Sequence, residues 1–249
     1  MNKPRMIDCD AAAALMEPLT DLVMKAGVAI LAVNRKVMTI EGKLDGSPAT
    51  EADFAADRII GDGLARLVPD VPALSEERVH QAKPPFRGSL FLIDPLDGTK
   101  EFVASRGEFT VNLALVTNGR CLASSARRRS DGCGAGWSAA VPSGCGSMKP
   151  AKGGPSRSIP ARSRNLAREK LGSALKFGSI AEGKADIYPR LAPTSEWDIA
   201  AGHAVVTAAG GKVTDDTGGP LRFGERTDGF IVPAFIAWGD PSAATDARH

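Results

Sequence analysis

Hydrophobic residues recur at helical spacing in two stretches near the start of the chain. From about residue 11 to residue 33 they fall on one helix face, with Pro18 close to the helix start. A second stretch runs from Glu51 to Leu67, after Thr50 as a candidate N-cap, and it has acidic residues in its first turn. The pattern predicts two amphipathic helices separated by a loop at 44–48.

Two short apolar runs predict buried strands. Residues 89–93 (SLFLI) end at Asp94-Pro95, and residues 109–116 (FTVNLALV) end at Asn118-Gly119, a dipeptide typical of a tight hairpin. A partner strand should follow that hairpin. Instead, 27 of the 45 residues in 121–165 are Gly, Ser, Ala or Pro, which leaves little apolar surface to offset the entropy of ordering them.

The part of the chain after residue 171 again has regular patterns. In order, it predicts short strand-like or helical elements at 174–180 and 185–188, a helix at 198–209, and closing strands at 212–214 and 230–237. The interleaving of helices and strands predicts an α/β or α+β fold. We expect an N-terminal α+β subdomain over 1–120, an atypical segment over 121–170 and a C-terminal α/β subdomain over 171–249.

Charge is distributed unevenly along the chain. The whole sequence has 31 Lys and Arg, 29 Asp and Glu, and a formal net charge of +2. Eight of the basic residues but only one acidic residue, Asp131, lie in 121–165, so the remainder has 23 basic and 28 acidic residues. The basic excess therefore does not indicate a nucleic-acid polymer as partner. No apolar run approaches the roughly 18 residues of a membrane span, and we expect a cytoplasmic protein.

The segment DPLDGT at 94–99 carries the clearest chemistry. Asp94 and Asp97 lie three residues apart at the end of a predicted buried strand, and the turn between them can bring the Leu96 carbonyl to the same point. Oxygen ligands at this spacing suit magnesium better than zinc. Further carboxylates are available from Glu76-Glu77 and from Asp198, which opens a predicted helix whose N-terminus favours phosphate.

The order of these motifs resembles that of a known enzyme family. SPATEAD with Asp53, then Glu76-Glu77, DPLDGT, Trp197-Asp198 and Gly210-Gly211 resemble the lithium-sensitive, magnesium-dependent phosphomonoesterases that include inositol monophosphatase and fructose bisphosphatase. The longer stretches are similar to the CysQ-type 3'(2'),5'-bisphosphate nucleotidases; they are DPLDGTKEF, GEFTVNLAL, LSEE, SALKF, AEGKADIYPR and WDIAAGHAVVTAAGG. Lys100-Glu101-Phe102 separates this branch from the inositol phosphatases. The resemblance covers roughly residues 8–120 and 171–240.

The resemblance implies a layered sugar-phosphatase fold with alternating helix and sheet layers. It implies hydrolysis of the 3'-phosphate of adenosine 3',5'-bisphosphate (PAP) to AMP and phosphate, and it leaves open action on the sulfated nucleotide PAPS. Two or three Mg²⁺ ions would be held by Glu76, Asp94, the Leu96 carbonyl, Asp97 and Asp198, with Asp94 bridging two of them.

The same resemblance implies roles in catalysis and substrate binding. Asp53, Thr99 and Glu76 would be catalytic, because Thr99 with Asp53 would orient and deprotonate the attacking water. The backbone at Gly98-Thr99 would hold phosphate oxygens. Lys176, with Ser173 nearby, would contact the nucleotide, although SALK matches the family's SSLK imperfectly. The expected substrate-binding set is Glu76, Leu96, Asp97, Gly98, Thr99, Lys176 and Asp198.

Each motif also has a purely structural explanation. DP and DG pairs are common turn formers, Glu77 is more often a solvent-facing neighbour than a ligand, and Asp198 alone would be an N-cap. His203 is expected to serve packing or hydrogen bonding, and Arg127-Arg128-Arg129 to form a solvated run. The conjunction of the motifs in order favours the catalytic interpretation.

The resemblance breaks after Asn118-Gly119-Arg120, where the family continues with apolar strands and a helix. A reading frame shifted over about 121–150, with a deletion near 165–172, would explain the Arg-, Ala-, Gly-, Ser- and Cys-containing composition, and this is our hypothesis. Without a partner strand, residues 109–116 would lose ladder hydrogen bonds and buried side chains worth about 1.5 to 3 kcal/mol each. Such losses are large against a total stability of about 5 to 15 kcal/mol.

Two alternatives to a PAP phosphatase therefore stand beside it. One is an inositol monophosphatase-like phosphomonoesterase, and the other is an inactive relic disrupted in 121–170. The expected partner is a small nucleotide bisphosphate. A homodimer and peripheral contact with the inner membrane are left open.

Overall fold

The computed structural model describes residues 5–42, 48–81, 86–105, 109–129, 136–140 and 174–246. At its centre lies a five-stranded sheet in the order β3-β4-β5-β6-β7. β4 runs parallel to β3, and the remaining neighbours are antiparallel. The strands are β3 (Ala73–Ser75), β4 (Ser89–Asp97), β5 (Phe109–Thr117), β6 (Arg120–Arg129) and β7 (Gly136–Ala140).

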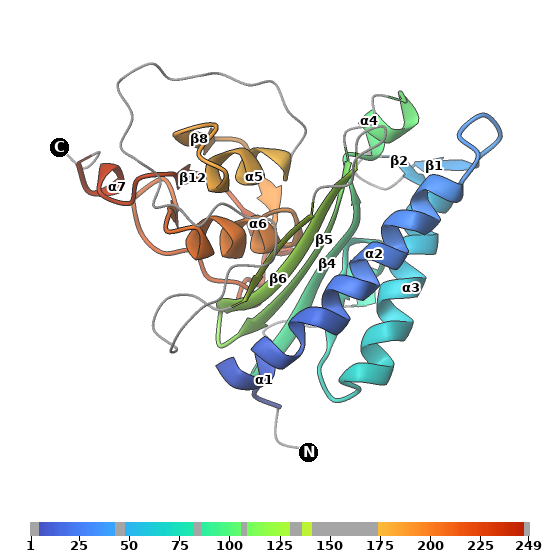
Figure 1. Cartoon of the computed structure of the whole chain (residues 1–249), viewed down its shortest axis with the longest axis horizontal. Coiled ribbons are helices and arrows are strands. Elements are labelled where there is room, and N and C mark those ends of the chain that lie inside the picture. The colour runs from blue at the N-terminus through green and yellow to red at the C-terminus, as the bar shows by residue number, and fades with distance from the viewer. Residues whose placement is uncertain are drawn as a thin grey trace.

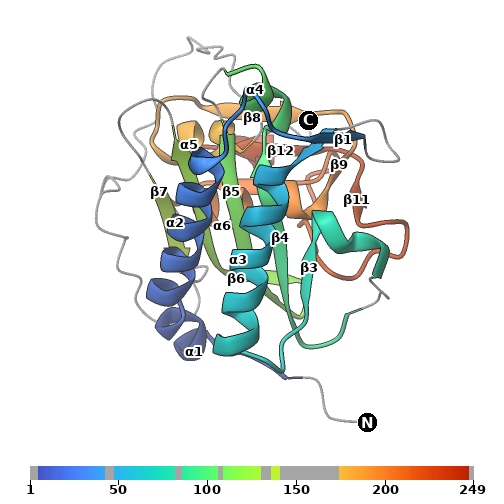
Figure 2. The same cartoon turned by 90° about the vertical axis from the view of Figure 1, so that its right-hand side faces the viewer.

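Two long helices cover one face of this sheet, as Figures 1 and 2 show. They are α2 (Met16–Ala32), which follows the short α1 (Cys9–Ala14), and α3 (Glu51–Leu67). α3 approaches α2 closely because position 63 is glycine: a Cβ there would lie 2.2 Å from a Leu22 methyl carbon. Phe91, Ile93 and alternate residues of β5 complete this first core.

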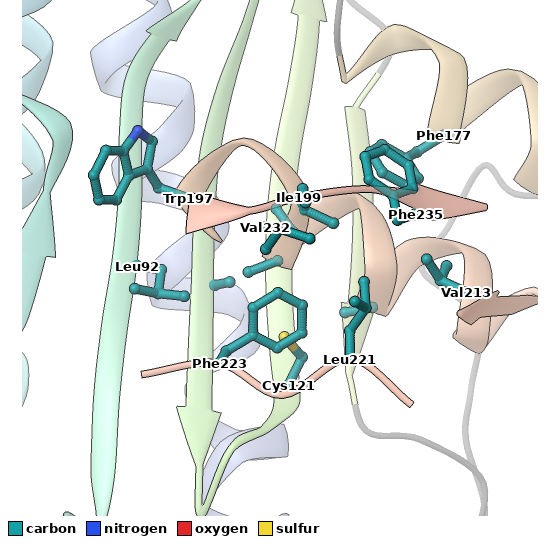
Figure 3. Close-up of a cluster of buried hydrophobic side chains, with 14 of the residues drawn as sticks. Leu92, Cys121, Phe177, Trp197, Ile199, Val213, Leu221, Phe223, Val232 and Phe235 are labelled. Carbon is teal, nitrogen blue, oxygen red and sulfur yellow. The ribbon is translucent and has the colours of Figure 1, made fainter. Parts of the chain in front are cut away.

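The opposite face of the sheet is covered by α6 (Glu196–Ala208) and the C-terminal elements (Figure 1). Leu92 of β4 and Cys121 of β6 point into this second core, where they meet Phe223 and Trp197 (Figure 3). A helical layer, the central sheet and a second helical layer with small sheets therefore follow one another, as the layered fold predicts.

The remaining elements are short and surround these layers. They are β1 (Ile40–Gly42), β2 (Pro48–Thr50), the 3-10 helix η1 (Glu76–Gln81), α4 (Thr99–Val103), α5 (Leu175–Ala181), β8 (Ile187–Arg190), β9 (Thr194–Ser195), β10 (Lys212–Thr214), β11 (Ile231–Val232), β12 (Phe235–Trp238) and α7 (Ala243–Asp246). β10, β12 and β8 form one small sheet, β11 pairs with β9, and β1 pairs with β2.

The helix and strand predictions hold with local differences. The helix predicted from about residue 11 is divided at Leu15 into α1 and α2, and the helix predicted at 198–209 begins earlier, at Glu196. Residues 174–180, left open between strand and helix, form α5. The closing segment 230–237 consists of two strands, because Pro233 cannot donate a ladder hydrogen bond and separates β11 from β12.

The expectation that β5 lacks a partner strand is wrong. β6 pairs with β5 from Thr117 opposite Arg120 to Phe109 opposite Arg129, and β7 pairs with β6 in turn. The ladder uses backbone groups, so a strand of small and basic residues can supply it. The rest of the atypical segment, at 130–135 and 141–173, lies outside the described residues.

Candidate active site

Two acidic residues reach the same edge of the central sheet because the strands that carry them run in parallel. In the pairing of β3 with β4, Ser75 lies opposite Ile93, and Glu76 and Asp94 are the next residues of the two segments. Asp94 is only 2% exposed, whereas Glu76 is partly buried at the start of η1. The sheet register thus aligns the two carboxylates.

A third carboxylate comes from the first turn of α6. Asp198 is the third residue of this helix, and its Oδ2 accepts hydrogen bonds from the Ser195 amide at 3.2 Å and from the Thr194 hydroxyl. One carboxylate oxygen from each of Glu76, Asp94 and Asp198 lies within 4.8 Å of the other two. The fold therefore brings together acids from three elements that are far apart in the sequence.

The turn between Asp94 and Asp97 contains one extra residue relative to β5. Asp94 lies opposite Asn112, but Asp97 lies opposite Thr110, so a bulge separates the two pairs. Within the bulge, the Leu96 amide donates to Asp94 Oδ1 at 3.0 Å. This irregularity is what the Asp-Pro and Asp-Gly pairs of the sequence predict, and it leaves both carboxylates on the same end of β4.

Asp97 is held by donors from β5 and from the start of α5. Its Oδ2 accepts from the Ala174 amide at 2.8 Å, from Thr110 Oγ1 at 3.2 Å and from Asn112 Nδ2 at 3.4 Å. Asp97 does not belong to the tight group of three carboxylates. Its charge nevertheless raises the pKa of Asp94 and of Asp198, so it lies in the same electrostatic environment.

The clustered acids disfavour one another's ionisation. Burial raises the pKa of Asp94 well above its ordinary value, and the charges of Glu76, Asp97, Asp198 and Asp53 raise it further. Burial and the Asp97 charge raise the pKa of Asp198 to about 6, although its hydrogen bonds oppose the shift. A bound cation would relieve this repulsion. The donors are all hard oxygens, so the residues present fit a magnesium site.

Asp53 and Thr99 form a hydrogen-bonded pair beside these acids. Asp53 is 1% exposed, and its Oδ2 accepts from the Thr50 amide at 2.8 Å and from the Thr50 hydroxyl at 2.7 Å. Thr99 Oγ1 lies 3.0 Å from Asp53 Oδ1 and 3.0 Å from the Leu96 carbonyl oxygen. Thr50, the N-cap of α3, thus fixes the Asp53 carboxylate, and this carboxylate faces the Thr99 hydroxyl.

The backbone at Gly98 and Thr99 begins the short helix α4. Gly98 has φ 99°, a conformation that favours glycine, and its carbonyl accepts from the Phe102 amide. Amides in the first turn of a helix have no partner within that helix. The position is therefore compatible with the predicted contacts to phosphate oxygens.

Two basic side chains from the C-terminal part of the chain lie next to the carboxylates. Lys176 of α5 places Nζ 4.9 Å from the centre of the Tyr188 ring, and burial together with the Arg190 charge lowers its pKa. Arg190 ends β8, and its charge lowers the pKa of Asp198. Among the described residues, its buried Nε has no hydrogen-bond partner. Ser173 lies outside the described residues.

Arg190 is the basic residue that the motif reasoning missed. The signal was present in the stretch AEGKADIYPR, which ends at Arg190 only eight residues before Asp198. By contrast, His203 matches its structural interpretation. Its ring packs edge-on against Phe223 at 5.4 Å, and burial lowers its pKa to about 4.

A layered α/β fold with clustered carboxylates, an Asp–Thr pair and two adjacent cations is the arrangement of a metal-dependent phosphatase. The relationship to known proteins defines the class further. The chain belongs to the inositol monophosphatase family, whose model matches residues 12–127 and 149–245. Residues 128–148 lie between the two matched parts.

Several curated relatives of the chain are CysQ nucleotidases. The chain is 39% identical over 252 aligned residues to the 3'(2'),5'-bisphosphate nucleotidase CysQ of Escherichia coli K12, covering 89% of this chain and 98% of the relative. It is 36% identical to the CysQ protein of Buchnera aphidicola, with 84% and 87% covered. The crystal structure of CysQ from Bacteroides thetaiotaomicron is 27% identical and superposes with a TM-score of 0.59, covering 90% and 97%.

A structure with lower identity supports the fold alone. The extragenic suppressor protein suhB from Bartonella henselae is 22% identical and has a TM-score of 0.68, covering 94% of this chain and 97% of that one.

None of the helices in the described ranges combines the length and hydropathy needed to cross a bilayer.

Proposed function

We propose that the protein is a magnesium-dependent phosphatase that converts PAP and water to AMP and phosphate, and that it also accepts PAPS. The observation that carries the proposal is the position of Lys176 and Arg190 beside the carboxylate group. A substrate with two phosphates needs a metal site for one and a separate cationic site for the other. The 39% identity to a CysQ nucleotidase and the Lys100-Glu101-Phe102 signature support the same substrate class.

The metal would be held by oxygen ligands from β4, η1 and α6. Glu76, Asp94, the Leu96 carbonyl, Asp97 and Asp198 are the proposed ligands for two or three ions, with Asp94 central because it is the most buried. Bound Mg²⁺ would offset the carboxylate charges, polarise the phosphate and make a water molecule more acidic.

The Thr99 hydroxyl and Asp53 would direct that water. When Thr99 donates to Asp53 Oδ1, its oxygen keeps lone pairs that can accept a proton from water. A proton taken from water by Thr99 can then pass to Asp53 through the same hydrogen bond. Two donors from Thr50 hold the Asp53 carboxylate in place, so its orientation does not depend on substrate.

Lys176 and Arg190 would bind the 5'-phosphate, and the amides at Gly98-Thr99 would bind the 3'-phosphate. The partial burial of Lys176 strengthens its attraction to an anion, and a guanidinium such as that of Arg190 is a strong donor to phosphate oxygens. Each phosphate would thus be recognised by different chain segments, which distinguishes a bisphosphate from a monophosphate.

Phosphate release from three substrates tests this proposal. With Mg²⁺, the protein should hydrolyse PAP faster than 3'-AMP, which lacks the 5'-phosphate, and much faster than inositol 1-phosphate. Chelation with EDTA or addition of lithium should stop the reaction. Asp94→Asn should remove essentially all turnover, since it deletes the central carboxylate. Preference for inositol 1-phosphate, or normal turnover by the Asp94 variant, would contradict the proposal.

We also propose that the protein works in the cytoplasm. Homodimer formation and peripheral association with the inner membrane are separate questions. Light scattering after size exclusion answers the first, and fractionation of cells that express the chain answers the second.

A further inference from the structure

A close ion pair joins the segment of Glu76 to the helix of Asp53. Arg78 Nη2 donates a hydrogen bond to Asp57 Oδ1 at 3.0 Å, and Nε lies 2.9 Å from Asp57 Oδ2 without the alignment of a hydrogen bond. The Asp57 side chain is 11% exposed and that of Arg78 is 38% exposed. One hydrogen bond and one close charge contact to the same largely buried carboxylate hold the guanidinium against α3.

The pair belongs to the two segments that carry Glu76 and Asp53 of the proposed site. Arg78 follows Glu76 by two residues in η1, and Asp57 follows Asp53 by one helical turn in α3. Asp53 and Asp57 therefore have different partners: Asp53 faces Thr99, and Asp57 holds η1.

α3 leaves space for the guanidinium at Gly61, one further turn along. A Cβ at this position would lie 2.9 Å from Arg78 Nη2, closer than side-chain carbons normally approach. Asp53, Asp57 and Gly61 recur every four residues and so share one side of the helix. This side thus contains the Asp53 carboxylate, the Asp57 carboxylate and a gap that the arginine occupies.

The sheet fixes the chain only as far as Ser75. Ser75 is the last residue of β3, and its hydroxyl accepts from the Glu77 amide at a long 3.4 Å. Glu76 is the first residue of η1, so the way in which η1 is held contributes to the position of its carboxylate. The Arg78–Asp57 pair holds η1 against α3 at that point.

We propose that the Arg78–Asp57 ion pair is a positioning device that sets Glu76 for binding a divalent cation. The inference rests on the proposed function in one respect, that Glu76 is a metal ligand. Residues that orient metal ligands change metal affinity by roughly 10- to 100-fold when they are replaced. For a pair that is partly exposed we expect the lower end, about a tenfold loss of affinity.

Simple electrostatics predicts the opposite change in metal affinity when Arg78 is replaced. Arg78→Gln removes a positive charge near a cation site, so charge alone would tighten metal binding. Positioning predicts weaker binding for both Arg78→Gln and Asp57→Asn. Arg78→Lys keeps the charge but not the planar guanidinium that contacts both Asp57 oxygens, and its Mn²⁺ affinity should lie between those of the parent and Arg78→Gln.

Mn²⁺ binding to the full chain, followed by electron paramagnetic resonance of the free ion, tests the proposal without requiring turnover. Arg222→Gln is the matched control, because Arg222 also forms an ion pair with a carboxylate, that of Glu225, at an exposed place. We expect about tenfold weaker Mn²⁺ binding for Arg78→Gln and Asp57→Asn, and no change for the control.

Gly61→Ala separates positioning from loss of stability. It keeps both charges and improves helix propensity, yet its new Cβ displaces the guanidinium. We expect an unchanged or higher melting temperature together with weaker Mn²⁺ binding. In the phosphatase assay, these variants should need more Mg²⁺ for half-maximal rate but reach a similar rate at saturation.

Three results would overturn the proposal. They are parental Mn²⁺ affinity in Arg78→Gln and Gly61→Ala, tighter binding in Arg78→Gln, or no Mn²⁺ binding by the parent chain. Failure of the parent to hydrolyse PAP while it binds Mn²⁺ would instead contradict the proposed function alone.

Discussion

Replacing Asp198 with asparagine should stabilise the metal-free protein at alkaline pH and abolish its stabilisation by magnesium. Asp198 is partly buried near Asp97, and these two influences raise its pKa from 3.8 to about 6. The folded protein therefore binds a proton at this site more readily than the unfolded chain does. Ionisation of Asp198 opposes folding above pH 6, and this opposition disappears as the pH falls toward 4.

The size of the effect follows from the pKa shift. A shift of about two units corresponds to roughly 3 kcal/mol at pH 8. Asparagine retains an oxygen that can accept from Thr194 and Ser195, but both hydrogen bonds lose the assistance of the charge. We therefore expect a net gain of about 1 to 3 kcal/mol in the free energy of unfolding, or roughly 3 to 10 °C in melting temperature.

Thermal unfolding in EDTA at pH 8 and pH 4.5 measures this effect. The gain should be large at pH 8 and small at pH 4.5, and Mg²⁺ should raise the melting temperature of the parent but not of the variant. Asp240→Asn serves as a control, because this carboxylate lies far from the acidic cluster in sequence and accepts hydrogen bonds from Ser242. Destabilisation of the Asp198 variant at pH 8, or an equal gain at both pH values, would refute the reasoning.

Three further predictions concern the C-terminal half of the molecule. Arg190→Gln should raise KM for PAP roughly tenfold or more and leave 3'-AMP hydrolysis nearly unchanged, because a charge-assisted contact to the 5'-phosphate is lost; equal losses on both substrates would argue against that contact. Gly202→Ala should cost about 1 to 3 kcal/mol in a urea titration, since its Cβ would lie 2.2 Å from a Phe177 ring carbon; parental stability would contradict the packing. The parent should lose stability below pH 6.5, because burial lowers the pKa of His203 to about 4 and keeping the ring neutral in the folded protein costs about 2 kcal/mol at pH 5. His203→Gln should therefore lose less stability over this pH range. An unchanged pH profile in the variant would count against this reasoning.

Elements with a strong local signal were predictable from the sequence. α3 begins where Thr50 and Asp53 form reciprocal capping contacts, and both residue types are typical helix starts. The Asn118-Gly119 turn has φ values of 49° and 74°, as the two-residue hairpin requires. In these places local propensity and the tertiary structure agree.

The approximate arrangement of the carboxylates was predictable as well, but its tertiary details were not. The bulge after Asp94 follows from the proline and glycine in DPLDGT. The stretch AEGKADIYPR contains Arg190, but the approach of this residue to Asp198 depends on the pairing of β8 with β12 and on the packing of α5 against α6. The Arg78–Asp57 pair likewise joins residues 21 positions apart that belong to no shared motif.

Composition was misleading for β6, and the reason is physical. Its first residues still alternate between the two cores: Cys121 is buried among the residues against α6, whereas Leu122 packs against the core of α2 and α3. This alternation, with the backbone ladder, is enough to specify a strand next to a fully buried one. The average composition of 121–165 concealed a signal that occupies only its first two positions.

The place where the sequence leaves the family pattern bears directly on Asp97. The family match stops at residue 127, and the next residue, Arg128, is the ladder partner of Thr110. Thr110 and Asn112 both donate to Asp97, so β6 supports the strand that holds this carboxylate. A frame shift in this stretch, which is our hypothesis, would therefore change the residues of the strand that pairs with β5, while the backbone ladder between the two strands is present. Resequencing the gene through codons 121–150 tests the hypothesis. An unbroken frame would mean that the present β6 is the strand with which this site evolved.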